Sequence, residues 1–161
     1  MTGVQTCALP ISEAALTRKM IQSDDLIRQR RFADARLVLD EILAAQPRNA
    51  RALYGMAQVV SQTPSSPEAD PKAEENDKIQ AQHERLEKAI KLYLGAIDAA
   101  STESERWMIQ WSYVFIGRIL DFQEFRADAL AAYEKAIALG DITGGAYKEA
   151  VDGKLKPFGQ K

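Results

Sequence analysis

Residues 126–137 read RADALAAYEKAI, and this stretch contains the spacing that decides the fold. Ala129 is followed four residues later by Tyr133, and three residues after that by Ala136 and Ile137. Because an α-helix turns once in about 3.6 residues, these steps place all four side chains on one stripe of a helix. The stretch therefore predicts a helix that buries one apolar face.

The same spacing occurs twice earlier in the chain. The two further copies are Ala35, Leu39 and Ile42-Leu43, and Ala89, Tyr93 and Ala96-Ile97. A stripe that is repeated in three helices predicts stacked copies of one helical unit. Because a stacked helical array presents an extended concave surface, it is more often a binding protein than an enzyme.

The composition agrees with a single helical domain. The chain has 161 residues, enough for one domain with a core, and good helix formers dominate it. The 21 basic and 23 acidic side chains leave a net charge of −2, and no strongly basic segment favours nucleic-acid binding. Since no apolar run reaches about 18 residues, we expect no membrane span.

Local signals place the helices along the chain. Ser12 is a candidate N-cap, Pro47 ends a helix, Thr102 with Glu105 fits a capping box, and Gly140 is a candidate C-cap. We expect helices at about residues 13–31, 33–46, 49–60, 77–100, 104–122, 126–139 and 143–151.

Two segments interrupt or follow this helical domain, which we place at residues 13–153. Residues 61–76 read SQTPSSPEADPKAEEN, and their prolines, serines and acids predict a flexible, solvated insert. The alternatives for the insert are a segment that grips a ligand and a phosphorylated linker. The last helix is expected to end at Gly153, which leaves residues 154–161 as a C-terminal tail.

Residues 1–12 read MTGVQTCALPIS and resemble the translation of a sequencing adapter. A signal peptide does not fit, because the first basic residue is Arg18 and no adequate apolar stretch precedes it. We expect these residues to be a disordered artefact and the chain to be the C-terminal part of a longer protein. Cys7, the only cysteine, then says nothing about redox compartment, and localisation stays undecided.

The helix pairs resemble tetratricopeptide repeats, a family of helix–turn–helix units of about 34 residues. The family's apolar positions in the first helix of a pair match Leu53, Met56, Ala57 and Val60, and again Tyr113, Ile116, Gly117 and Leu120. Those of the second helix match the repeated stripe, with Pro47 where the family often has proline. Gly117 falls where close helix packing favours a small side chain.

The resemblance implies an all-α fold of antiparallel helical hairpins, stacked as a right-handed superhelix. About three hairpins are expected, followed by a C-terminal capping helix near Ala146 and Ala150. The array departs from the family's regular spacing, because the insert lengthens the second hairpin and further residues extend the helix that carries Trp107 and Trp111.

The residue types argue against catalysis within this chain. His83 is the only histidine and lies in a polar helical stretch, where we expect it to be solvated. A metal site would need further nitrogen or sulfur ligands near it. A nucleophile pair would depend on His83 or Cys7. We therefore expect no catalytic residues, no metal and no cofactor.

The resemblance also implies a ligand groove along the first helix of each pair. Its positions correspond to Arg51, Tyr54, Gln58 and Ser61, and to Trp111, Val114, Arg118, Asp121 and Phe122. Arg51 and Arg118 can pair with a carboxylate, while Tyr54 and Phe122 can supply apolar contact. The basic clamp with which some members bind chaperone tails is absent.

Trp107 and Trp111 lie one helical turn apart in the most apolar helix. They form either an aromatic platform for a peptide or part of the packing against the helix of residues 77–100. The second interpretation is the one we favour.

These observations predict a protein–protein interaction scaffold that binds a peptide or partner protein in the groove. The alternative is an accessory domain of a bacterial exported enzyme, such as a peptidase, that packs on a catalytic neighbour. A third possibility is a self-association surface, and the sequence leaves the oligomeric state undecided.

Overall fold

The computed structural model describes residues 10–160, and every regular element in that range is a helix. These elements are α1 (Glu13–Arg28), α2 (Phe32–Ala45), α3 (Ala50–Gln62), α4 (Ser66–Ala69), α5 (Glu75–Ala99), a 3-10 turn η1 (Glu103–Glu105), α6 (Arg106–Phe122), α7 (Arg126–Ala138) and α8 (Tyr147–Leu155). The predicted all-α fold is confirmed. Cys7 and most of the predicted artefact lie outside the described residues.

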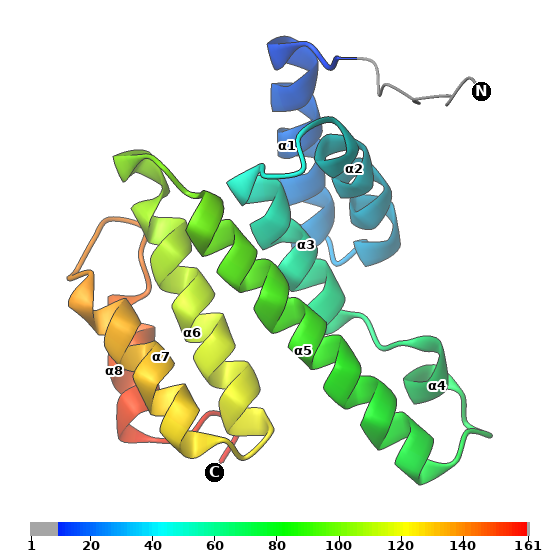
Figure 1. Cartoon of the computed structure of the whole chain (residues 1–161), viewed down its shortest axis with the longest axis vertical. Coiled ribbons are helices and arrows are strands. Elements are labelled where there is room, and N and C mark those ends of the chain that lie inside the picture. Colours follow the sequence, from blue (N-terminus) through cyan, green and yellow to red (C-terminus); the bar gives the residue numbers. More distant parts are fainter. Residues whose placement is uncertain (1–9, 161) are drawn as a thin grey trace, which may run out of the picture.

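The helices form stacked antiparallel hairpins, as the repeated stripe predicts (Figure 1). α1 pairs with α2, α3 with α5, and α6 with α7, while α8 packs on α7 and α6 as a C-terminal cap. The first helices of successive hairpins also touch, α1 against α3 and α3 against α6. Within residues 10–160, no helix is both long and apolar enough to cross a membrane.

The repeated stripe forms the core. Of its members, Ala35, Leu39 and Ile42 of α2, Ala89, Tyr93 and Ala96 of α5, and Ala129, Tyr133 and Ala136 of α7 are at most 1% exposed. The small side chains let the facing helix approach closely, and the larger ones fill the space between hairpins. The second helix of each hairpin therefore holds the array together.

The sequence predicts the end of a helix correctly where a side chain or a glycine caps that end. The hydroxyl of Ser12 accepts a 3.2 Å hydrogen bond from the amide of Ala15, and Thr102 with Glu105 forms the expected capping box. Gly140 adopts φ +81° after α7, the left-handed conformation that glycine favours. These three predicted boundaries are confirmed.

α1 ends three residues before its predicted end, and the reason is backbone geometry. Arg30 adopts φ +59°, and the amide of Arg31 donates to the carbonyl of Leu26. The same turn follows α6, where Glu124 has φ +65° and Phe125 donates to Leu120. A left-handed residue with this hydrogen bond is a common helix stop. Glycine usually occupies the left-handed position, so Arg30 and Glu124 give no indication in the sequence that a helix ends there.

The capping helix differs from the prediction. It runs from Tyr147 to Leu155, so Gly153 lies inside it and does not end it. A Cβ at Gly153 would lie 2.5 Å from the ring of Tyr133, and one at Gly117 would lie 2.6 Å from the same ring. Close packing of α6, α7 and α8 around one tyrosine therefore explains both glycines.

The insert at residues 61–76 contains the short helix α4, which is tied to α5. The carboxylate of Glu68 accepts hydrogen bonds of 2.7 and 2.9 Å from the guanidinium of Arg85, which also binds the carbonyls of Val60 and Ser61. The Glu68 and Arg85 side chains are only 8% and 12% exposed. The expectation of a plain solvated loop misses this contact, and the flexibility of the insert stays a prediction.

Candidate functional site

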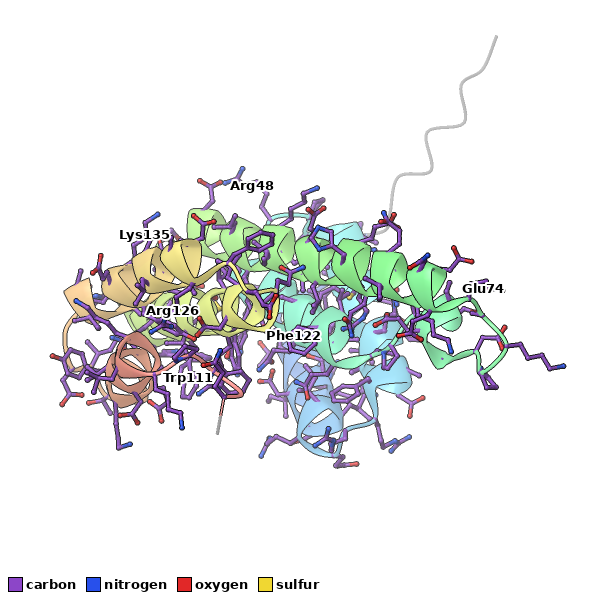
Figure 2. All side chains as sticks on the ribbon, turned by 90° about the horizontal axis from the view of Figure 1, so that it is seen from below. Arg48, Glu74, Trp111, Phe122, Arg126 and Lys135 are labelled. Carbon is purple, nitrogen blue, oxygen red and sulfur yellow. The ribbon has the colours of Figure 1, made fainter. Side chains whose placement is uncertain are left out.

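The first helices of the hairpins form one face of the molecule. Figure 2 shows α5 and α7 along one side, α3 and α6 beneath them, and α1 and α8 at opposite ends of the far side. The contacts of α1 with α3, α3 with α6 and α6 with α8 give the same order. The surface that α1, α3 and α6 line between them is hereafter called the groove.

A hollow of about 370 Å³ opens at the start of α3 and α6. It is lined by Asp24, Ile27 and Arg28 of α1, by Arg51, Tyr54 and Gln58 of α3, and by Trp107 of α6. Three residues of the predicted groove thus lie together. The sequence-based list missed Asp24 and Trp107, because the match to the family assigned no groove position in α1 and began in α6 only at Trp111.

The hollow combines a charged pair with an aromatic wall. Arg51 Nη2 lies 2.5 Å from Asp24 Oδ2, and both side chains remain partly exposed. The ring of Tyr54 meets that of Trp107 edge to face, with centroids 5.8 Å apart. Gln58 Nε2 lies 3.5 Å from the Tyr54 hydroxyl. Polar groups and apolar surface therefore converge in one concavity, as they do in ligand sites.

Tyr54 keeps its proton throughout the usual pH range. Burial raises the pKa of its hydroxyl well above the usual value, and the nearby Asp24 charge raises it further. The phenol is therefore neutral and can both donate and accept a hydrogen bond at the base of the hollow.

A row of rings continues from the hollow along α6. Phe115 stacks on Tyr93 of α5 with a centroid distance of 5.5 Å, and Trp111 stacks on Phe115 at the same distance. The indole of Trp111 donates a 3.0 Å hydrogen bond to the carbonyl of Gly144. Trp107 and Trp111 are both partly buried and pack against the core cluster that includes Tyr93 of α5, as the packing interpretation predicts.

Arg118 lies at the far end of this row. Its guanidinium is 5.7 Å from the centroid of Phe115 and 5.0 Å from that of Phe158, in the segment after α8. The C-terminal segment therefore crosses α6 at a residue that the sequence assigns to the groove. The predicted list did not include Phe158, because the tail matches no part of the repeat pattern.

Asp121 does not reach the groove surface. Its side chain is 0% exposed, and its carboxylate accepts hydrogen bonds from Arg126 at 2.9 and 3.1 Å. It also accepts 2.9 Å bonds from the Tyr133 hydroxyl and the amide of Phe158. A carboxylate with this set of internal donors acts as a structural centre. Val114, another predicted groove residue, is fully buried.

Phe122 lies apart from the hollow, against the long helix α5. Its ring is 58% exposed and borders a hollow of about 200 Å³ with Ile79 and Leu86 of α5 and Phe125. This outer cleft also contains His83, which is half exposed and hydrogen-bonded to Gln123 at 2.9 Å. The structure therefore separates Phe122 from Arg51 and Tyr54, although the repeat register placed them in one groove.

The hollow gathers charged, polar and aromatic side chains. Within residues 10–160, no three His, Asp or Glu side chains gather closely enough to hold a metal ion. The groups that converge at the hollow are an ion pair, an amide and aromatic rings. Such groups recognise backbone, carboxylate and side-chain features of a bound chain.

The comparisons with known proteins bear on these hairpins. A family model described as "Tetratricopeptide repeat" matches residues 22–69, from the end of α1 through α4. Neither the curated proteins nor the solved structures contain a match to the chain. Tetratricopeptide repeats stack into arrays that bind other proteins and are typically not catalytic. Residues 22–69 thus match the tetratricopeptide-repeat family, and the stacked hairpins agree with a helical array of that kind.

Proposed function

We propose that the groove binds a peptide or an extended segment of a partner protein. The hollow between α1, α3 and α6 carries this proposal, because it is the place where charged, polar and aromatic side chains converge. Its volume of about 370 Å³ suits one or two side chains of a bound peptide.

Each wall of the hollow suits a different part of a peptide. Arg51 offers guanidinium N–H groups for a carboxylate or a carbonyl, and Asp24 offers an acceptor for an amide. Tyr54 and Trp107 supply rigid aromatic surface at a low cost in conformational entropy. The half-exposed Arg51–Asp24 pair can exchange partners without leaving a buried charge unpaired.

A peptide selection tests the proposal. The purified chain is used to select binders from a displayed library of random peptides, and the affinities of the enriched peptides are measured by fluorescence anisotropy. We expect Arg51→Glu to weaken binding at least tenfold while the circular dichroism spectrum stays the same. Arg36→Glu, which makes the same charge change on the exposed side of α2, should leave the affinity unchanged.

Equal binding to the wild-type chain and to the Arg51→Glu variant would contradict the proposal. The alternatives from the sequence, an accessory domain of an exported enzyme and a self-association surface, stay predictions. So does the exclusion of nucleic acid as a partner.

A further inference from the structure

We propose that the chain's own segment of residues 156–160 acts as an internal ligand at one end of the groove. Phe158 then marks the kind of partner that fits there, a peptide that places an aromatic side chain on Arg118. This inference rests on the proposed function, since it names the ligand chemistry of that groove and a segment that competes for it.

The segment is held by contacts of its own, beyond the end of α8. Arg126 donates to the carbonyls of Gly153 and Lys154 at 2.9 and 2.8 Å, which fixes the last turn of the helix. The amide of Phe158 then donates a 2.9 Å hydrogen bond to Asp121. Phe158 is thereby held next to Arg118 of α6.

Arg118 contacts two aromatic rings. Its guanidinium lies 5.7 Å from the centroid of Phe115 and 5.0 Å from that of Phe158. Stacked guanidinium groups keep their N–H donors at the edge, where a carbonyl or carboxylate can reach them. In the part of the chain that the structure describes, Arg118 forms no ion pair, so this donor capacity is available to a ligand.

The site of Phe158 belongs to the same surface as the hollow. Trp111 stacks on Phe115, which contacts Arg118, and Phe115 lies 6.3 Å from Tyr54 in the wall of the hollow. A peptide that enters the hollow at Tyr54 and continues along α6 reaches the place that Phe158 occupies. Tail and peptide therefore compete for the same contact with the Arg118 guanidinium.

The contacts of the segment suit an exchangeable ligand. The side chain of Phe158 is 52% exposed, so its ring is covered on one side only. The amide of Phe158 supplies one hydrogen bond to the buried Asp121, and Pro157 has no amide proton to add another. A bound peptide can repeat these two contacts and add those of the hollow, so it can displace the tail.

The test compares three forms of the chain: the full chain, a Phe158→Ala variant, and a chain that ends at Lys156. The shortened form keeps both carbonyls that Arg126 binds. The probe is the synthetic peptide acetyl-KPFGQK, which copies residues 156–161, and a second peptide has Ala in place of Phe. Binding is followed by NMR through the indole N–H of Trp111.

We expect the probe to bind the shortened chain and the Phe158→Ala variant at least tenfold more tightly than the full chain. The Ala peptide should bind all three at least tenfold more weakly than the probe binds the shortened chain. Arg118→Met keeps the approximate length of the side chain but removes its charge. In the shortened chain, this substitution should abolish the gain in affinity for the probe.

Equal affinity of the probe for the full chain and both variants would overturn the inference, as would equal binding of the Phe and Ala peptides. The result is separate from the test of the proposed function. If selected peptides bind through Arg51 but are insensitive to Phe158→Ala and Arg118→Met, the groove function stands and the internal ligand is rejected. If no library peptide depends on Arg51, the proposed function fails by that measurement alone.

Discussion

The hydroxyl of Tyr133 donates a 2.9 Å hydrogen bond to Oδ2 of Asp121, and this contact joins the two helices of the last hairpin. Arg126 and the amide of Phe158 donate to the same carboxylate, which has no exposed surface. One buried anion therefore organises α6, α7 and the segment after α8. Burial and this hydrogen bond together raise the pKa of the Tyr133 hydroxyl.

Asp121→Ala should destabilise the fold by about 2–4 kcal/mol, because it leaves a buried phenol and a half-buried guanidinium without their acceptor. Urea unfolding measures the change as a lower midpoint with a similar slope. Asp40→Ala, on the exposed face of α2, is the matched control and should change stability by at most about 0.5 kcal/mol. Equal midpoints for the two variants would show that the carboxylate is not a structural centre.

Gly117 is expected to tolerate no larger side chain. A Cβ there would lie 2.6 Å from the buried ring of Tyr133, which Asp121 holds in place. Gly117→Leu should therefore cost about 1–3 kcal/mol through overpacking. Calorimetric melting temperatures measure the effect, and an unchanged value would contradict the repeat register in α6.

Gly95, unlike Gly117, has room for a larger side chain. It lies inside α5, and an added Cβ would make an ordinary contact of 3.7 Å with Leu53. Gly95→Ala should stabilise the protein by about 0.5–1 kcal/mol, because alanine loses less backbone entropy in a helix. A loss of stability comparable to that of Gly117→Leu would mean that helix packing at Gly95 is tighter than the structure indicates.

The Glu68–Arg85 pair predicts an acid-dependent loss of stability. Hydrogen bonds from Arg85, opposed in part by burial, lower the pKa of Glu68 from 4.5 to about 2. Because the pKa is lower in the folded state, the pair stabilises the fold fully above about pH 4.5. That contribution falls as the pH drops toward 2 and is absent below it. The full contribution is roughly 3 kcal/mol.

The measurement compares wild type with Glu68→Gln at several pH values, so that the titration of other carboxylates cancels. The difference in unfolding free energy should be largest near pH 6 and should shrink between pH 4.5 and 2. A difference that does not change over this range would show that the pair contributes nothing through its charge.

Gln110 should be needed to fix the connection between α7 and α8. Its Nε2 donates 2.8 Å bonds to the carbonyls of Ala136 and Gly140, and its Oε1 accepts a 2.7 Å bond from the amide of Ala146. Gln110→Leu keeps the approximate size but leaves these groups unpaired, at a cost of about 2–4 kcal/mol. Hydrogen exchange at Ala146 should speed up at least tenfold.

Gln80→Leu is the control for Gln110, because its exposed amide binds only Glu84 at the start of α5. It should leave exchange at Ala146 unchanged. Equal exchange rates in the wild type and in Gln110→Leu would mean that the loop is fixed by other contacts.

The fold was predictable where its signal is local or periodic. The Ala129–Tyr133–Ala136 spacing predicts a buried helix face, and the structure buries it, because helical periodicity alone decides which side chains share a face. Caps at Ser12 and Gly140 are likewise visible in the sequence, since each involves only neighbouring residues. Helix ends that depend on a left-handed Arg30 or Glu124 leave no such signal.

The groove was only partly predictable. The repeat register places Arg51, Tyr54 and Gln58 on the same side of α3, and these three residues line one hollow. It does not show that Asp121 turns inward to Arg126 or that Phe122 lies toward α5. A side chain at the border between two faces of a helix can point toward either face. Contacts with other elements decide which face it joins.

The sequence by itself determined the helices, their buried stripes and the hairpin order, because these follow from residue spacing along one chain. Only the tertiary structure decided that Asp24 joins Arg51, that Tyr133 lies against Gly117 and Gly153, and that Phe158 returns to Arg118. Those relationships join residues far apart in the chain. They depend on how the hairpins stack and on where the tail crosses them, which no local pattern encodes.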